Sequence, residues 1–324
     1  MKRSLIFFMV LILCCITTSC YTTIEKIPVE KYQKLEGEEA YTEGDGTLDN
    51  PYVIDTKGKL IYLSNQTNEN KGQKAYYELQ SDIDLEGINW NPIKRFEGHF
   101  NGNGYEISNF VIKNKYTTYK YYTNKIGLFG NNFGTIERLG VTKFNIYMFW
   151  TLKGLNVQIG GIAGENGGVI ENCYAIGIIT AKSTNQKNTI SENISRINIG
   201  GITSINASYN YNQNSYVEGE INKCYCSVKD GLTYMYPVDV SENPISGKID
   251  GCVTSFYPMY ISNYEKQKNR FGECCIVFKF ENFNNKEFYI NDLKWNEEIW
   301  DLDDIEYENQ KYVNDHYPKL KRNK

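Results

Sequence analysis

The sequence predicts an all-β protein, a right-handed parallel β-helix, from three observations. First, five short stretches align, each with an apolar residue, two polar or small residues and a second apolar residue; they begin at Ile107, Ile136, Ile170, Ile221 and Ile249. Second, a further column lies two positions after each stretch, at Ile112, Val141, Ala175, Cys226 and Thr254. Third, glycines recur two residues before an aligned Ile, at Gly134, Gly168, Gly219 and Gly247. Internal repetition of this kind is typical of solenoid proteins.

The N-terminus resembles a bacterial lipoprotein signal. Lys2 and Arg3 precede an apolar run from Leu5 to Ile16, which is too short to cross a bilayer as a stable helix and is typical of a signal peptide. Small residues lead from this run to Cys20, as in the lipobox, where the cysteine carries lipid. We therefore expect residues 1–19 to be a lipoprotein signal peptide and Cys20 to carry acyl chains such as palmitate. An ordinary signal peptide followed by an unrelated cysteine is the alternative.

The charge balance excludes one large class of partner. The chain has 35 basic and 39 acidic residues, and loss of Lys2 and Arg3 with the signal peptide leaves 33 basic residues and a net charge of −6. Such a chain lacks the basic footprint of a nucleic-acid-binding protein. Tyr21, rather than the Asp that retains some lipoproteins at the inner membrane, follows Cys20. We therefore expect a lipid-anchored envelope protein at the outer membrane or cell surface.

The segments that precede the repeats predict a tether and a cap. Residues 20–43 are polar and without a sustained period, which is typical of a flexible tether. Residues 44–99 are expected to form an N-terminal cap and the first turn of the helix. Within them, Thr56 can cap a short helix that covers the open strand edge. The segment 76–85 alternates like a strand.

The repeats themselves occupy residues 100–255. An apolar residue at both ends of each four-residue stretch requires a bend between them, because strict alternation would place the two on opposite faces. The third position of each stretch is therefore expected to adopt a left-handed backbone; it holds Asn109, Arg138, Asn172, Lys223 and Gly251. The aligned Ile residues are unevenly spaced, and Ile221 comes 51 positions after Ile170. A surface excursion is expected at Lys182 to Asn198.

The last segment is expected to close the far end of the stack. Residues 256–324 contain Trp295 and Trp300, whose large side chains can plug a solenoid that would otherwise expose its core. This segment is predicted to be a C-terminal cap.

The repeats resemble the GLUG motif of bacterial surface β-helix proteins, which also occurs in the N-terminal, non-catalytic region of immunoglobulin A proteases. The resemblance rests on Gly127-Leu128-Phe129-Gly130 and on the stretch that begins at Gly161-Ile162-Ala163-Gly164. It covers residues 44–324 and implies a pectin-lyase-like solenoid. Because the motif residues are structural, the resemblance implies almost nothing about chemistry.

Metal-dependent catalysis finds little support among the residue types present. The protein has two histidines, His99 and His316, and no HExxH motif, so the zinc protease part of the related enzymes is absent. The aligned cysteines at Cys173, Cys224 and Cys252 can be buried thiols, a disulfide ladder or a metal line, and buried thiols are favoured. We expect no cofactor and no metal.

One acidic pair is a candidate for carbohydrate chemistry. Asp82 and Asp84 lie two residues apart on a predicted strand, so both side chains project from one face. They can converge on a ligand, as carboxylates do in enzymes that cleave polysaccharides. They can equally fix the turn that enters the helix.

Tyrosine clusters give the best indication of a ligand surface. Two segments of the chain hold them, with candidate ligand residues at Tyr116, Tyr119, Tyr121, Tyr122, Tyr209 and Tyr211. Tyr beside Asn and Ser suits a surface that faces sugars or proteins. The sequence therefore predicts a non-enzymatic, lipid-anchored, adhesin-like surface protein that binds a host or envelope glycan or protein. A polysaccharide lyase or hydrolase that uses the groove of the β-helix is the alternative.

Overall fold

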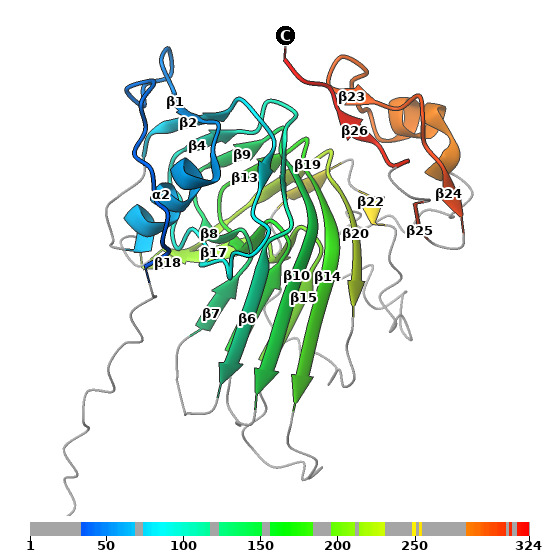
Figure 1. Cartoon of the computed structure of the whole chain (residues 1–324). Helices are drawn as coiled ribbons and strands as arrows, with labels where there is room; N and C mark the ends of the chain where they lie inside the picture. Colours follow the sequence, from blue (N-terminus) through cyan, green and yellow to red (C-terminus); the bar gives the residue numbers. More distant parts are fainter. Residues whose placement is uncertain are drawn as a thin grey trace, which may run out of the picture. The chain divides into compact units, whose positions relative to one another are not determined.

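Parallel strands dominate the computed structural model, so the all-β part of the prediction is confirmed (Figure 1). The structure describes residues 34–68, 74–116, 123–150, 156–183, 196–210, 214–230, 248–250, 253–254, 283–308, 311–312 and 316–323. Within these described residues, the strands are accompanied by the α-helix α2 (Lys57–Asn68) and the π-helical turn η3 (Phe288–Asp292).

The first sheet has seven parallel strands in the order β1-β2-β4-β9-β13-β19-β21. Their bounds are β1 (Tyr52–Ile54), β2 (Tyr76–Leu79), β4 (His99–Asn101), β9 (Thr135–Glu137), β13 (Val169–Glu171), β19 (Glu220–Asn222) and β21 (Lys248–Asp250). The predicted column is confirmed here, because Ile136, Ile170, Ile221 and Ile249 are paired in register. The first three of these side chains are buried.

The second sheet holds the strands that follow the left-handed corners. Its path runs β22-β20-β14-β10-β5-β3, and β6 also pairs with β10. The bounds are β3 (Ile83–Asp84), β5 (Glu106–Ser108), β6 (Val111–Tyr116), β10 (Gly140–Trp150), β14 (Tyr174–Ser183), β20 (Tyr225–Asp230) and β22 (Val253–Thr254). The second predicted column is confirmed from Val141 through Ala175 and Cys226 to Thr254.

Two three-stranded parallel sheets complete the pattern. The third sheet contains β7 (Thr123–Ile126), β11 (Asn156–Gly160) and β15 (Arg196–Gly200), and the fourth contains β8 (Phe129–Asn132), β12 (Ala163–Asn166) and β16 (Thr203–Ile205). The chain visits the first, second, third and fourth sheets in that order and then returns to the first. Each passage from β4 to β19 therefore adds a strand to every sheet.

The alignment places Ile107 in the column of Ile136, and this prediction is wrong. Ile107 pairs with Val141 in the second sheet, rather than with Ile136 in the first. Phe100 takes the predicted place of Ile107, because it is the residue that pairs with Ile136. The residue that occupies this place therefore lies seven positions earlier in the sequence than the alignment indicated, and the register continues the column back to Tyr77 and Tyr52.

A β-bulge explains the misplacement. Asn109 has φ 62° and precedes the strand in which Ile112 pairs with Ile146, and not with Val141. Lys143, with φ 53°, lies at the matching register shift between Thr142 and Phe144. The bulge thus produces the same sequence pattern as the corner between the first and second sheets. In both, an Ile is followed two residues later by a left-handed residue and then by an apolar residue.

The corners themselves are as predicted. Arg138, Asn172 and Lys223 have φ of 51°, 50° and 50°, and each lies between a strand of the first sheet and a strand of the second. A left-handed residue at this point reverses the facing of the next side chain. Both apolar residues of each stretch can therefore enter the core: Ile136 and Leu139 are buried, as are Ile170 and Cys173.

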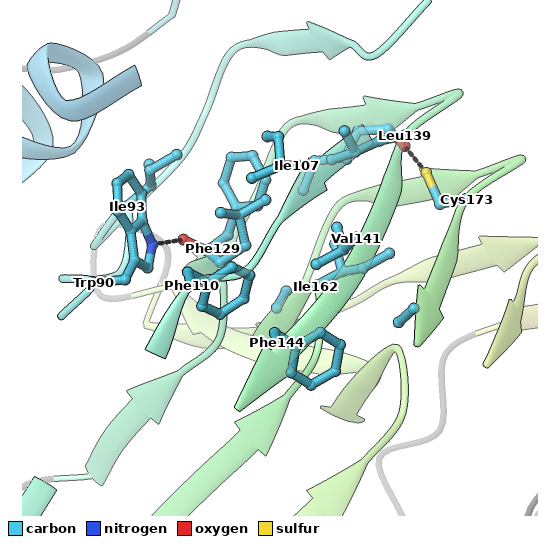
Figure 2. Packing of buried hydrophobic residues seen from close by; sticks show 14 of the residues in the cluster. Trp90, Ile93, Ile107, Phe110, Phe129, Leu139, Val141, Phe144, Ile162 and Cys173 are labelled. Atoms are coloured by element: carbon cyan, nitrogen blue, oxygen red, sulfur yellow. Dashed lines mark hydrogen bonds between the residues drawn. The ribbon is translucent and has the colours of Figure 1, made fainter. Parts of the chain in front are cut away.

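The core consists of apolar side chains stacked between successive strands (Figure 2). Phe110 and Phe144 stack with ring centroids 5.5 Å apart and an interplanar angle of 13°. Trp90 is buried and donates its indole N–H to the carbonyl oxygen of Leu128 at 3.0 Å, the contact drawn in Figure 2. Stacking of equivalent rings from consecutive passages buries apolar area and fixes the register.

The N-terminal region packs as the sequence indicates, with one difference. Thr56 Oγ1 accepts a hydrogen bond from the Lys59 N–H at 3.3 Å and caps α2. Residues 34–43 belong to the segment assigned to the tether, yet they contact α2: the Leu35 N–H donates to Asn65 Oδ1 at 2.9 Å. Tyr41 also stacks on Tyr52 at 4.6 Å. The side chain of α2 that binds Leu35 is the polar Asn65, and a single polar residue does not indicate such a contact in the sequence.

The C-terminal residues form a second apolar cluster against the second sheet. Trp295 and Trp300 stack at 4.2 Å, and Trp300 is 5.9 Å from the ring of Tyr225. The indole N–H of Trp300 donates to Asn172 Oδ1 at 3.2 Å. The short strands of this region pair antiparallel: β23 (Trp300–Asp301) with β26 (Lys319–Leu320), and β24 (Tyr307–Glu308) with β25 (Lys311–Tyr312).

Candidate functional site

The acidic pair lies beside the strands of the second sheet, with both carboxylates hydrogen-bonded to neighbouring residues. Asp82 Oδ1 accepts the Glu106 N–H at 3.0 Å, and its Oδ2 lies 2.6 Å from an Arg322 guanidinium nitrogen. Asp84 Oδ1 accepts the Asn109 side-chain amide at 3.0 Å and the Glu86 N–H at 2.9 Å. These contacts match the turn-fixing role described above. The role of the pair in carbohydrate chemistry stays a prediction.

The ionisation of Asp84 limits the chemistry that it can perform. The hydrogen bond from the Asn109 amide, and then that from the Glu86 N–H, lower the pKa of Asp84 below its ordinary value. A carboxyl group with a lowered pKa is ionised at neutral pH and holds no proton for a leaving group. Asp84 is therefore unsuited to act as a general acid.

A carboxylate that the sequence analysis missed gathers three hydroxyl groups. Glu106 Oε1 accepts the Tyr174 hydroxyl at 2.6 Å and the Tyr317 hydroxyl at 3.1 Å, while its Oε2 accepts the Thr142 hydroxyl at 3.0 Å. Burial, followed by the charge of Glu106, raises the pKa of Tyr174 well above its ordinary value. Tyr174 stays a neutral donor, and the cluster joins the C-terminal residues to the second sheet.

A buried asparagine ladder runs from the fourth sheet toward the first. Asn132 Nδ2 donates to Asn166 Oδ1 at 2.8 Å, and Asn166 Nδ2 donates to Asn206 Oδ1 at 2.7 Å. Asn166 also donates to the carbonyl oxygens of Gly168 and Glu220 at 3.2 and 3.1 Å. Asn132 and Asn166 are fully buried. The ladder was missed, although Asn recurs two residues before Gly134 and Gly168 and this spacing could have revealed it.

Two of the three aligned cysteines, Cys173 and Cys224, lie in the core. Cys173 is a buried free thiol whose Sγ lies 3.1 Å from the Glu171 carbonyl oxygen and 3.6 Å from that of Ile136. Cys224 is buried beside it, with its Sγ 3.4 Å from the Cys173 backbone nitrogen. No disulfide therefore links Cys173 to Cys224. Cys252 lies outside the described residues.

Two predicted ligand residues lie in described strands, and the others do not. Tyr116 ends β6 and pairs with Trp150, and Tyr209 lies in the hairpin of β17 (Ala207–Asn210) and β18 (Ser215–Glu218), opposite Tyr216. The remaining predicted residues fall outside the described part of the chain: Cys20, Tyr119, Tyr121, Tyr122 and Tyr211. Within the described residues, no group of three or more His, Cys, Asp and Glu is arranged to hold a metal.

The outer side of β6, β10 and β14 presents lysine and aromatic residues. These strands lie side by side, beyond the bulge in β10 (Figure 1). Inward side chains such as Ile146, Met148 and Ile179 are buried, and the alternate positions face out. Lys113 is exposed, Ile178 is 39% exposed, and Tyr147, Phe149 and Thr180 are half-buried. We call these five outward residues the lysine–aromatic face.

Strand register places further lysines beside this face. Lys113 pairs with Tyr147, which pairs with Thr180. Two residues further along β10, Phe149 pairs in register with Lys115 and with Lys182. Neighbouring strands lie about 4.8 Å apart, so Lys113 and Tyr147 are adjacent. The sequence analysis missed this surface because its residues come from three passages of the chain.

Comparisons with known proteins identify partial relatives. No family model matches the chain. A protein of Evansella cellulosilytica, named "Putative Gly-rich membrane protein", is 37% identical over 139 residues, which are 40% of this chain and 15% of that protein. The protein "Halomucin" of Haloquadratum walsbyi is 28% identical over 172 residues, which are 50% of this chain and 2% of that protein. The chain thus spans a small fraction of the length of these relatives.

One solved structure aligns with most of the chain at low similarity. It is the crystal structure of "a putative immunoglobulin A1 protease from Bacteroides ovatus", with 16% sequence identity, coverage of 89% of this chain and 98% of that chain, and a TM-score of 0.32. A TM-score of this size supports no inference about fold or activity. Within the described residues, no helix is both long and apolar enough to cross a membrane.

Proposed function

We propose that this chain is a lipid-anchored cell-surface protein, built as a right-handed parallel β-helix, that binds a glycan or protein without catalysis. The ordered visits of the chain to four sheets support the β-helix, because each passage extends every sheet by one parallel strand. Helix α2 lies beside the first strands as the N-terminal cap, and the Trp295–Trp300 cluster packs along the second sheet, against Asn172 and Tyr225. The GLUG resemblance accords with this architecture.

The domain division is part of the same proposal. It consists of a signal peptide at 1–19, a tether at 20–43, a cap and first turn at 44–99, the β-helix at 100–255 and a closing element at 256–324. The contacts of residues 34–43 with α2 favour a shorter tether that ends near residue 33. Acylation of Cys20 would anchor the chain to the membrane. The partial relative with "membrane protein" in its name supports a location in the envelope.

The lysine–aromatic face is the observation that carries the binding function. Within the described residues, the side chains of Lys113 and Tyr147 make no hydrogen bond or ion pair, unlike the carboxylates of Asp82, Asp84 and Glu106. Exposed aromatic and charged side chains without an internal role are typical of a contact surface. The predicted Tyr119, Tyr121 and Tyr122 lie in sequence between β6 and β7, immediately after this face.

The anchor is tested by metabolic labelling with an alkyne fatty acid in a bacterial host. We expect the wild-type chain to incorporate the label and to sediment with membranes. We expect the Cys20→Ser variant to lose both properties, whereas the Cys226→Ser variant, a matched control in the second sheet, retains both. Label on the Cys20→Ser variant would exclude the proposed anchor.

Binding is tested with the purified full chain in detergent on arrays of glycans and of envelope and host proteins. We expect saturable binding that is reduced in the Tyr147→Ser variant and unchanged in the Asp301→Asn variant, whose exposed carboxylate lies in the C-terminal region. A chain that binds nothing on either array would refute the adhesin-like function and leave a structural role in the envelope.

A further inference from the structure

The described C-terminal residues lie beside early strands of the second sheet as well as late ones. We call residues 283–306 and 316–323 the C-terminal clasp, and we count one passage of the chain from each strand of the first sheet. The clasp contacts five consecutive passages, which begin at β2, β4, β9, β13 and β19, and so joins passages that are not neighbours in either sheet. In this order, the contacted residues are Asp82; Asn103, Tyr105 and Glu106; Arg138; Asn172 and Tyr174; and Tyr225.

The buried part of the clasp covers two rings of the late passages. Tyr174 and Tyr225 are paired in register on β14 and β20, and their rings stack at 5.2 Å with an interplanar angle of 5°. The Trp300 ring lies 6.2 Å from the first and 5.9 Å from the second, and all three side chains are buried. Burial of these aromatic side chains attaches the clasp firmly to β14 and β20.

The strand beside these rings lacks a side chain at the matching position. Gly140 is paired in register with both Glu106 and Tyr174, and a Cβ at Gly140 would lie 2.5 Å from Cζ of Tyr174. The Tyr174 ring therefore lies over β10, and its hydroxyl reaches Glu106 on β5 at 2.6 Å. The Tyr317 hydroxyl of the clasp binds the same carboxylate oxygen at 3.1 Å. Glu106 thus connects its own early passage to a later passage and to the clasp.

The exposed part of the clasp lies on the early passages. An Arg322 guanidinium nitrogen lies 2.6 Å from Asp82 Oδ2, and the guanidinium is 4.9 Å from the centroid of the Tyr105 ring. Arg138 donates a hydrogen bond to the Lys321 carbonyl oxygen of the clasp at 2.7 Å. An exposed ion pair contributes little to stability by itself, so several such contacts act together here.

We propose that the C-terminal clasp couples the early and late passages, so that strands at the two ends of the second sheet open together. In a stack of this kind each passage contacts its neighbours, and an end passage can open alone. The clasp adds contacts between residues as far as 240 positions apart in the sequence. An early passage that opens must release the clasp, and a late passage that opens must release it too. The coupling goes beyond the proposed function, because it depends on neither the lipid anchor nor the ligand.

A plug at the far end of the stack, the role that the sequence predicts for this segment, would act differently. A plug covers the last passage and protects its neighbours, so the early strands would not respond to it. Coupling by the clasp means that a change in a late strand alters the opening of an early strand. The two roles are therefore distinguished by changing one end of the stack and measuring the other.

The experiment measures amide hydrogen exchange of the full chain in detergent by mass spectrometry. The variant Ile221→Val removes one methylene group from a buried side chain of β19 that belongs to the core cluster of the stack. We expect exchange to accelerate by about three- to tenfold in β19, and by the same factor in β2 and β4. No acceleration in β2 and β4 would overturn the coupling.

A second background assigns the coupling to the clasp. The tail variant, Tyr317→Ala with Arg322→Ala, removes the bonds to Glu106 and Asp82. In this background Ile221→Val should still accelerate exchange in β19, but by less than about twofold in β2 and β4. Undiminished acceleration in β2 and β4 would show that the stack transmits the change by itself, and would overturn the role of the clasp.

A milder pair of substitutions serves if the tail variant does not fold. Tyr317→Phe with Arg322→Gln keeps the aromatic ring in place and removes the hydroxyl that binds Glu106 and the charge that pairs with Asp82. We expect the acceleration that Ile221→Val causes in β2 and β4 to fall by at least half in this background. An unchanged acceleration would again overturn the role of the clasp.

The reciprocal measurement provides a matched control. Ile83→Val makes the same chemical change in a buried side chain of β3, at the early end of the second sheet. Because coupling between two sites is reciprocal, this variant should accelerate exchange in β20 while the clasp is intact and leave β20 within about twofold in the tail variant. Transmission in one direction alone would contradict a shared opening and overturn the proposal.

Discussion

The asparagine ladder and the lysine–aromatic face are polar features on the same stack of strands, and they differ in where their hydrogen bonds go. In the ladder, Asn166 satisfies its amide with Asn132, Asn206 and two backbone carbonyls, and its side chain is fully buried. On the face, polar and charged groups point outward and are left to solvent or to a ligand. A buried polar group must be satisfied from within the chain, whereas an exposed one is available for binding.

Breaking the ladder tests this distinction with the largest expected effect. The variant Asn166→Ala removes a donor and an acceptor that serve two neighbouring asparagines, and should lower the free energy of unfolding by about 3 kcal/mol. Urea denaturation followed by circular dichroism measures the change. The control Asn145→Ala, at an outward half-buried position of β10, should change stability by less than about 0.5 kcal/mol. Equal losses for the two variants would contradict the distinction.

The glycine column beside the ladder is the next place to break the stack. A Cβ on Gly168 would overlap the carbonyl oxygen of Gly134, which lies one residue before β9 in the preceding passage of the chain; this atom is backbone and cannot swing aside. We expect Gly168→Ala to cost about 2–3 kcal/mol in thermal or urea denaturation. The comparison variant Gly87→Ala meets open space and only strains a residue at φ +82°, so a loss of about 1 kcal/mol is expected. A smaller loss at Gly168 than at Gly87 would show that the strands can separate locally.

Asp84 sharpens the comparison because its carboxylate is exposed to solvent and yet accepts hydrogen bonds from Asn109 and Glu86. Its folded-state pKa is lowered by the Asn109 amide and the Glu86 N–H, so the ionised form favours the folded state. This contribution is fully present above the unfolded-state pKa of about 4 and is lost as the pH falls through the lower folded-state pKa. Wild type should therefore lose more stability than Asp84→Asn between about pH 5 and pH 2, by less than about 1 kcal/mol.

The same titration of the Asn109→Ala variant provides the control. This variant removes the largest cause of the lowered pKa of Asp84, so its acid dependence should lie between those of wild type and Asp84→Asn. Parallel acid curves for all three proteins would show that the Asn109–Asp84 contact contributes nothing to stability.

The sequence predicted the strand positions that repeat from one passage to the next. It did not predict contacts between residues that are distant in the sequence. The register of Ile136, Ile170 and Ile221 followed from alignment, because equivalent positions of parallel strands bury equivalent side chains. The alignment misplaced Ile107 because a bulge and a corner have the same four-residue sequence pattern. A bulge and a corner differ in the strand that follows, which a four-residue pattern does not contain.

The candidate surfaces were harder to predict than the core. Glu106 meets Tyr317 across 211 residues, and such a contact has no local signature. The lysine–aromatic face requires knowing which lysine of one passage lies beside which ring of the next, and the bulge at Lys143 shifts that register by one residue. The predicted tyrosines were chosen by local density, which indicates composition but not adjacency.

The hairpin of β17 and β18 has a consequence for how this chain can be altered. At its base, the Gly219 N–H donates to the Asn206 carbonyl oxygen at 3.1 Å, and Asn206 Nδ2 donates back to the Gly219 carbonyl oxygen at 3.0 Å. These two bonds close the base of the hairpin, so the stacked strands on either side keep their pairing whatever the length of the hairpin. An epitope tag or a small domain inserted between Asn210 and Ser215 should therefore be displayed without compensating substitutions elsewhere in the protein.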